Sequence, residues 1–76
     1  MKIQVLGTGC AKCKQLTANT ERAVAELGVP ATIEKVENVR EIMKFKVMST
    51  PALVVDGVVK STGKVLTPEA VKQLLV

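Results

Sequence analysis

Glycine and proline residues divide this chain of 76 residues into short segments, and this division limits the folds that it can adopt. Gly7 ends an apolar segment, Gly28 ends a longer one, and Pro51 stands directly before another. The pair Asp56-Gly57 separates two further apolar runs. No segment between these breaks approaches the roughly eighteen consecutive apolar residues of a membrane span. The sequence therefore predicts a small fold of short helices and strands.

The first three segments predict a strand, a helix and a strand. Residues 2–6 (KIQVL) and 31–36 (ATIEKV) alternate apolar and polar side chains, as strands with one buried face do. Residues 11–27 have apolar side chains three or four positions apart, which is the spacing of an amphipathic helix. Gly28 is expected at its C′ position, where a left-handed backbone is common. The predicted buried face of this helix consists of Cys13, Leu16, Thr20, Val24 and Leu27.

A second, shorter helix is predicted after Asn38, whose side chain can cap the first turn. This helix must end before Pro51, and we expect its end near Lys46. Its predicted buried face consists of Val39, Ile42, Met43 and the aliphatic part of Lys46.

The last third of the chain predicts a hairpin and a helix. Residues 52–55 and 58–61 flank Asp56-Gly57, a pair that favours a type I′ turn because both central residues need positive φ. Thr67 is suited to the N-cap of a final helix, and Pro68 to its first position.

The resulting order, β-α-β-α-β-β-α, predicts an α/β protein with a single domain over residues 1–76. Strands joined by a helix lie parallel and hairpin strands lie antiparallel, so one mixed four-stranded sheet flanked by helices accommodates all of them. Phe45 is the only aromatic residue, so we expect a core of aliphatic side chains.

The chain carries eleven Lys and Arg against seven Asp and Glu, a net charge of +4. The lysines are scattered and only Arg22 and Arg40 offer guanidinium groups, so we expect no nucleic-acid partner. The apolar stretch at the N-terminus is too short for a signal peptide, so we expect a cytoplasmic protein without a membrane partner. A monomer is the expected state.

Both cysteines lie in the segment Cys10-Ala11-Lys12-Cys13, between the first strand and the first helix. The free N–H groups in the first turn of a helix carry a partial positive charge that stabilises a thiolate. The thiol of Cys10 is therefore expected to ionise easily, helped by Lys12 and Lys14. Cys13 lies one turn further, on the predicted buried face, and is expected to be shielded. This arrangement suits thiol–disulfide exchange, which uses an attacking and a resolving sulfur.

The cysteine pair has other possible uses. A structural disulfide across so short a loop would remove at most about 2 kcal/mol of unfolded-chain entropy. Structural zinc wants four Cys or His ligands, and this chain has two cysteines and no histidine. Two thiolates can hold Cu(I), and the run GTGCAKC is similar to the start of heavy-metal-associated domains, although their order is β-α-β-β-α-β. A soft-metal carrier or a non-catalytic interaction module remains the alternative.

Four features together resemble the thioredoxin-fold superfamily over the whole chain: the cysteine segment, the run KVMSTPALVV (46–55), the Asp56-Gly57 hairpin and Gly63. The resemblance is to its very small glutaredoxin-like and thioredoxin-like members, the redox-active disulfide proteins. It implies that Pro51 follows a cis peptide bond and packs against the disulfide. It also implies that the backbone of Thr50 pairs with a substrate chain.

Two of the departures of this sequence from the superfamily pattern concern acidic residues. The buried acid typical of thioredoxins would fall at Gln4, so no carboxylate is offered there as a proton acceptor for Cys13. Glutaredoxins place an acidic pair after the glycine that matches Gly63, whereas Lys64 and Val65 follow it here.

We expect a thiol–disulfide oxidoreductase in which Cys10 is the nucleophile and Cys13 the resolving thiol. Its expected partners are a protein disulfide client and a reductase that the sequence does not identify. Neither a metal nor a cofactor beyond the Cys10–Cys13 disulfide is expected. The residues expected to bind substrate, to tune the redox potential or to keep the sulfur accessible are Thr50, Pro51, Ala11, Lys12 and Gly9.

Overall fold

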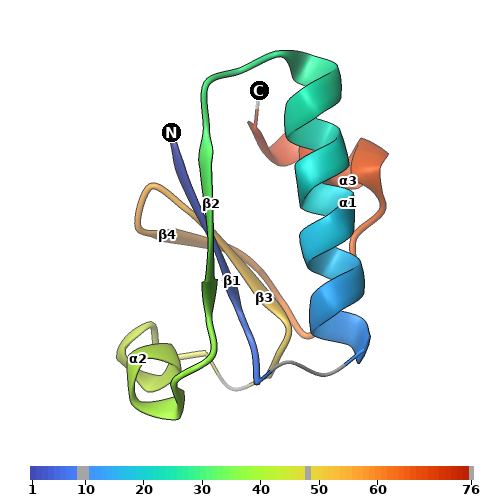
Figure 1. The fold of residues 1–76 in the computed structure, drawn as a ribbon. Coiled ribbons are helices and arrows are strands. Elements are labelled where there is room, and N and C mark those ends of the chain that lie inside the picture. The colour runs from blue at the N-terminus through green and yellow to red at the C-terminus, as the bar shows by residue number, and fades with distance from the viewer. Residues whose placement is uncertain (9–10, 48, 76) are drawn as a thin grey trace.

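A computed structural model describes residues 1–8, 11–47 and 49–75. A twisted sheet lies between two helices on one side and one short helix on the other (Figure 1). The order of elements is the predicted one, and most of their ends fall within two residues of the predicted ends. The elements are β1 (Lys2–Leu6), α1 (Ala11–Leu27), β2 (Thr32–Val36), α2 (Val39–Lys44), β3 (Ala52–Val55), β4 (Val58–Thr62) and α3 (Pro68–Leu75).

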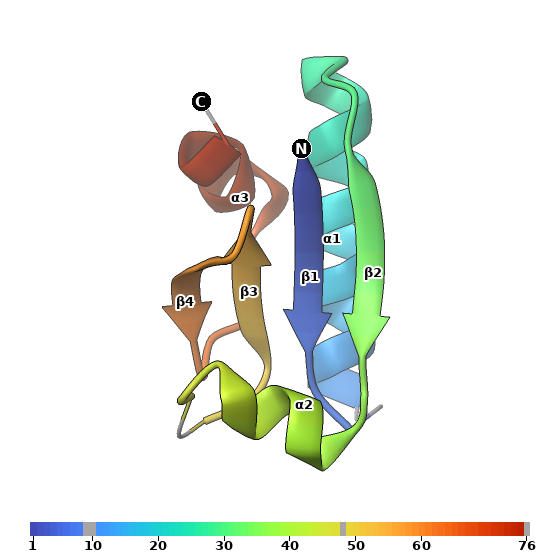
Figure 2. The ribbon, with the colours of Figure 1, turned by 90° about the vertical axis from the view of Figure 1, so that its left-hand side faces the viewer.

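The four strands form one mixed sheet in the order β2-β1-β3-β4 (Figure 2). β1 pairs with β2 in parallel, whereas β3 is antiparallel to both β1 and β4. The register places Leu6 beside Val36 on one side and beside Ala52 on the other. The ends of β1 and β2 and the start of β3 therefore lie at the same edge of the sheet, and α2 crosses that edge in Figure 2.

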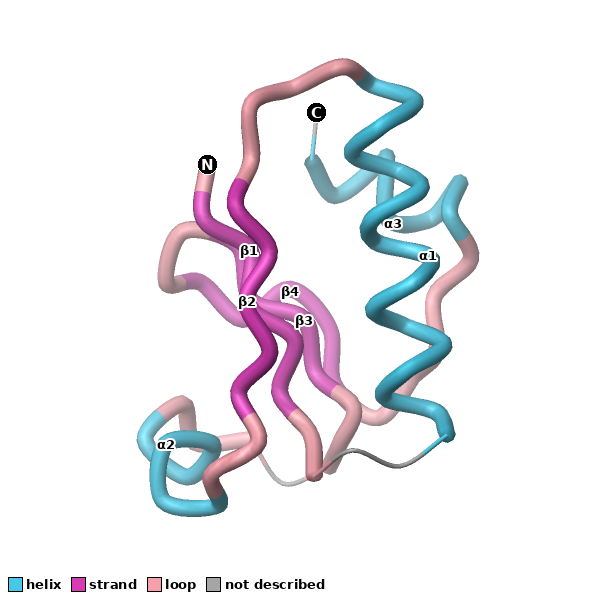
Figure 3. Tube along the Cα trace, in the orientation of Figure 1, coloured by secondary structure: helices cyan, strands magenta, loops and turns pink. Residues whose placement is uncertain are grey.

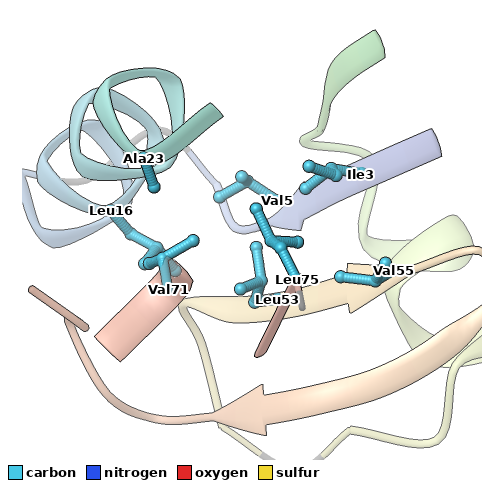
Figure 4. Close-up of a cluster of buried hydrophobic side chains, with 8 residues drawn as sticks. All are labelled: Ile3, Val5, Leu16, Ala23, Leu53, Val55, Val71 and Leu75. Atoms are coloured by element: carbon cyan, nitrogen blue, oxygen red, sulfur yellow. The ribbon is translucent and has the colours of Figure 1, made fainter. Parts of the chain in front are cut away.

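The face of the sheet toward α1 and α3 holds the larger core cluster. Side chains from β1, β3, α1 and α3 point toward one another across this layer (Figure 4). Aliphatic side chains supply all of its apolar surface, as the near absence of aromatic residues predicts. The cluster consists of Ile3, Val5, Leu16, Ala23, Leu53, Val55, Val71 and Leu75.

The opposite face is covered by α2 and holds a smaller cluster, made of Leu6, Val36, Ile42, Ala52 and Val54. The predicted buried face of α2 is correct for Ile42 but wrong for Val39 and Met43, which are 56% and 68% exposed. It is also wrong for Lys46, which is exposed and has a φ of 59° beyond the end of the helix. A helix of six residues can rest only about one side chain per turn on the sheet, so one apolar residue is enough to seat it.

The predicted caps and turns are present. Gly28, after α1, has a φ of 66°, and Asp56 and Gly57 have φ values of 50° and 82°, as a type I′ turn needs. Asn38 Oδ1 accepts a hydrogen bond of 2.8 Å from the backbone N–H of Arg40. The Thr67 hydroxyl oxygen accepts one of 3.2 Å from the N–H of Ala70, which confirms the N-cap of α3.

Polar contacts also join α1 to α3. Glu26 on α1 accepts a hydrogen bond of 2.8 Å from the ammonium of Lys72 on α3, and Arg22 adds one of 3.1 Å. The bond from Lys72 is the main reason that the pKa of the Glu26 carboxyl lies below its ordinary value. Asn19 donates a hydrogen bond of 2.7 Å to the carbonyl of Leu66, which fixes the segment before α3. Within the part of the chain that is described, each helix is too short or too polar to cross a membrane.

Candidate functional site

The candidate site lies at the sheet edge where β1 and β2 end and α1 begins (Figure 3). The connection from β2 through α2 to β3 passes the same edge, and β4 ends there. Gly7 follows β1 and Pro51 precedes β3. Because Leu6 pairs with Ala52, these two residues lie at the ends of neighbouring strands although they are far apart in the sequence. Loops at a strand edge can present reactive groups on a rigid support.

Cys13 lies in the first turn of α1 with its side chain only 5% exposed, which confirms the predicted shielding. Its sulfur lies directly against Gly7. A Cβ added at Gly7 would collide with Sγ of Cys13 and lie 3.1 Å from Cβ of Cys13. Gly7 is itself held by a hydrogen bond of 2.9 Å from its N–H to the carbonyl of Val36. The missing side chain of Gly7 therefore makes the space that the sulfur occupies.

A small pocket of about 40 Å³ opens beside Cys13. Its apolar part is formed by Val5, Gly7 and the buried Thr17, whose hydroxyl donates a hydrogen bond of 2.9 Å to the carbonyl of Cys13. Its charged part is formed by three exposed residues, one on α1, one in β2 and one directly after β2. These residues are Lys14, Lys35 and Glu37.

The segment before β3 forms the second part of the site. The Thr50-Pro51 peptide bond is cis, as the resemblance implies. Thr50 is exposed, whereas Pro51 is fully buried. The carbonyl of Pro51 accepts a hydrogen bond of 2.9 Å from the N–H of Gly63, and a Cβ added at Gly63 would lie 3.0 Å from Cβ of Ser49. The end of β4 therefore holds this segment in place.

The remaining predicted site residues lie before Cys13 in the sequence. Ala11 and Lys12 are exposed in the first turn of α1, while Gly9 and Cys10 lie outside the described residues. That first turn contains lysines and no acidic residue. Positive charge at a helix N-terminus opposes the helix dipole but favours a nearby anion.

Sequence reasoning missed three residues of the site. Gly7 was expected only to end the first apolar segment, but its φ lies outside the left-handed region and its role is steric. Lys35 and Glu37 were assigned no role. Lys35 pairs with Val5 in the sheet, so its side chain lies on the face that holds Cys13. The predicted parallel pairing of residues 2–6 with 31–36 was the one sequence signal that could have placed Lys35 and Glu37 near the cysteines.

Metal-ligating residues do not gather elsewhere in the described structure. Across residues 1–8, 11–47 and 49–75, His, Cys, Asp and Glu form no group of three or more that could hold a metal ion.

Comparison with known proteins gives consistent matches along the chain. The model of a family described as "Thioredoxin domain" matches residues 1–76. A protein named Thioredoxin from Methanothermobacter thermautotrophicus is 43% identical over 75 residues, which cover 99% of this chain and 97% of the relative. A protein named Thioredoxin from Methanocaldococcus jannaschii is 42% identical over 73 residues, which cover 96% and 84% of the two chains.

Proposed function

Because the chain belongs to the thioredoxin family and so has a thiol–disulfide redox function, we propose that Cys10 and Cys13 exchange electrons with disulfide substrates. The observation that carries this proposal is the placement of Cys13. Its shielded sulfur lies against Gly7 in the first turn of α1, one turn from the residue that precedes the helix. The pair then has the two unequal thiols that disulfide exchange needs.

Cys10 is the nucleophile in this proposal. It directly precedes Ala11, the first residue of α1, where free backbone N–H groups favour a thiolate. Lys12 and Lys14 add positive charge to the same turn. The thiolate attacks one sulfur of a substrate disulfide, and the other substrate sulfur leaves as a thiolate with the electron pair of the broken bond.

Cys13 completes the exchange. Its thiol loses a proton, and the sulfur attacks Cys10 in the mixed disulfide. The Cys10–Cys13 bond forms and the second substrate thiolate leaves, so that two electrons have passed from the protein to the substrate. Ala11 and Lys12 tune the potential of this couple, and Gly9 leaves Cys10 accessible.

The segment at Thr50 and Pro51 is the proposed platform for the substrate chain. Its support comes from position: Ala52, the next residue, pairs with Leu6, and Leu6 precedes the Gly7 that contacts Cys13. A protein disulfide is the proposed substrate, and a separate reductase restores the dithiol. The protein acts as a cytoplasmic monomer and uses no cofactor beyond its two sulfurs.

Insulin reduction driven by dithiothreitol tests the proposal. The wild-type protein should accelerate precipitation of the insulin B chain, and Cys10→Ser should abolish the acceleration. Cys13→Ser should still attack but accumulate a covalent protein–insulin complex, which non-reducing electrophoresis detects. Full activity of Cys10→Ser would refute the proposed role of Cys10.

Competition for Cu(I) against a chelator separates this function from the alternative. Tight one-to-one binding together with no insulin reduction would favour the soft-metal carrier. Weak binding together with insulin reduction would favour the oxidoreductase.

A further inference from the structure

The buried thiol of Cys13 needs a route for its proton, and this inference rests on the function proposed above. The thiolate is the attacking form of cysteine, so Sγ of Cys13 must lose its proton before or during its attack on Cys10. Gln4 offers a carboxamide that cannot take up this proton. By strand alternation it also lies on the opposite face of the sheet from Val5, which lines the pocket beside Cys13.

That pocket connects the sulfur to charged residues at the surface. Its volume of about 40 Å³ exceeds the roughly 10–15 Å³ that one water molecule requires. The charged residues that line it together with Cys13, among those described, are Lys14 from α1, Lys35 from β2, and Glu37 directly after β2. Among the described lining residues, β1 contributes Val5 and the turn after it contributes Gly7, neither of which titrates.

Among the described residues that line the pocket, Glu37 is the one that carries a carboxylate. The ammonium groups of Lys14 and Lys35 have no acceptor site, and the Thr17 hydroxyl is a poor base that already donates to the carbonyl of Cys13. Glu37 directly follows Val36, whose carbonyl is bonded to the N–H of Gly7. The backbone at Glu37 is therefore fixed next to the glycine that contacts the sulfur.

We propose that Glu37 acts as a general base that takes up the proton of Cys13, directly or through one water molecule, during resolution of the mixed disulfide. The S–H bond of Cys13 breaks and its proton passes to the Glu37 carboxylate. The freed electron pair forms the bond to Sγ of Cys10, and the substrate sulfur leaves as a thiolate. Glu37 then returns the proton to bulk water.

Replacing Glu37 with Gln separates this role from a simple charge effect, because the two predict opposite signs. A carboxylate that acted only by its charge would disfavour the Cys13 thiolate, so its removal would speed resolution. A carboxylate that accepts the proton would slow resolution when it is removed. Glu34→Gln is the matched control, since it removes the same charge three residues earlier. Glu34 lies in β2, pairs with Gln4 on the other face, and has its Oε2 3.7 Å from Nζ of Lys2.

Stopped-flow reaction of the reduced protein with dithiobis(nitrobenzoic acid) measures the two steps separately. The first coloured thiolate released reports attack by Cys10, and the second reports resolution by Cys13. In Glu37→Gln the ratio of the second rate to the first should fall about tenfold, less than a full general-base effect because bulk water also reaches the pocket. Glu37→Asp should recover part of the loss, and Glu34→Gln should match the wild type across the pH range.

Each outcome has a separate meaning. A second rate that is unchanged or faster in Glu37→Gln overturns the role of Glu37 while leaving the proposed function intact. A slow second rate in Glu37→Asp equal to that of Glu37→Gln also overturns it, since a merely structural role would not distinguish carboxylate from amide. A wild-type protein that releases no second thiolate refutes the proposed function itself.

Discussion

The two faces of the sheet have covers of different thickness. We call the face under α1 and α3 the deep face and the face under α2 the thin face. The face under α1 and α3 is covered by 17-residue and 8-residue helices, and its cluster includes side chains from both. The face under α2 is covered by a six-residue helix that buries one residue, Ile42. The candidate site includes parts of both covers. Cys13 lies in α1, which covers the first face, and the Thr50-Pro51 segment follows α2, which covers the second. The difference suggests that the sulfur is held by a deep core and the Thr50-Pro51 segment, the proposed platform, by a few local contacts.

The largest expected effect comes from truncating one buried side chain on each face. Leu16→Ala should lower the free energy of unfolding by about 3–5 kcal/mol, because a filled core cannot close the cavity. Ile42→Ala should cost about 2 kcal/mol, because the thin cover over it can relax. Urea denaturation with an unchanged slope measures both. Equal losses, or a larger loss for Ile42→Ala, would remove the contrast between the faces.

Gly7→Ala tests the contact between the deep face and the sulfur. The added Cβ collides with Sγ of Cys13, so we expect a loss of about 1–3 kcal/mol in stability and a slower second thiolate release. Gly28→Ala is the control: its φ of +66° strains the alanine backbone, but nothing lies within 4 Å of the added Cβ. It should destabilise the fold by about 1 kcal/mol without altering the ratio of the two release rates. A normal ratio in Gly7→Ala would show that the sulfur does not depend on this contact.

Gly63→Ala tests the local support of the platform. A φ of +69° and a Cβ 3.0 Å from that of Ser49 predict a loss of about 1–2 kcal/mol. The Thr50-Pro51 segment should shift, so the KM for insulin should rise more than kcat falls. Gly57→Ala has similar backbone strain at φ +82° with open space around it, and its KM should stay at the wild-type value. Equal KM values in both variants would argue against the platform.

The smallest expected effect concerns the ion pair between α1 and α3. The Lys72 ammonium lowers the pKa of Glu26 in the folded protein, so the pair stabilises the fold above the ordinary carboxyl pKa. That contribution is lost as the pH falls through the lowered pKa. Glu26→Gln should therefore unfold at a lower temperature than the wild type at pH 7, and the gap should narrow in acid. Glu21→Gln makes the same charge change five residues earlier in α1. An equally large difference in unfolding temperature for Glu21→Gln would assign the effect to net charge.

Sequence periodicity predicted the deep face better than the thin one. The spacing of apolar residues in 11–27 gave α1 at its observed bounds because a long helix buries a continuous stripe. The same rule misassigned Val39 and Met43, because α2 is too short for a stripe and rests on Ile42 alone. Turn chemistry at Asp56-Gly57 and Gly28 needed no tertiary information, since both depend on local φ.

The shielding of Cys13 and the cis bond before Pro51 were predictable, because both residues stand in recognisable sequence segments. The steric role of Gly7 depends on a contact between β1 and α1, and the pocket depends on Lys35 and Glu37 reaching α1 from the neighbouring strand. Such contacts depend on the packing of separate elements, so the sequence pattern of one element alone does not predict them.

Redox titration of the intact protein tests the central claim most directly. The protein would be equilibrated in dithiothreitol and glutathione buffers of graded potential, its free thiols blocked, and the mass of the products measured. The account predicts one two-electron transition between fully reduced protein and a monomer with a Cys10–Cys13 bond, within the roughly −270 to −120 mV range of known oxidoreductases. Two thiols that stay reduced at every potential, or that form bonds only between molecules, would contradict it.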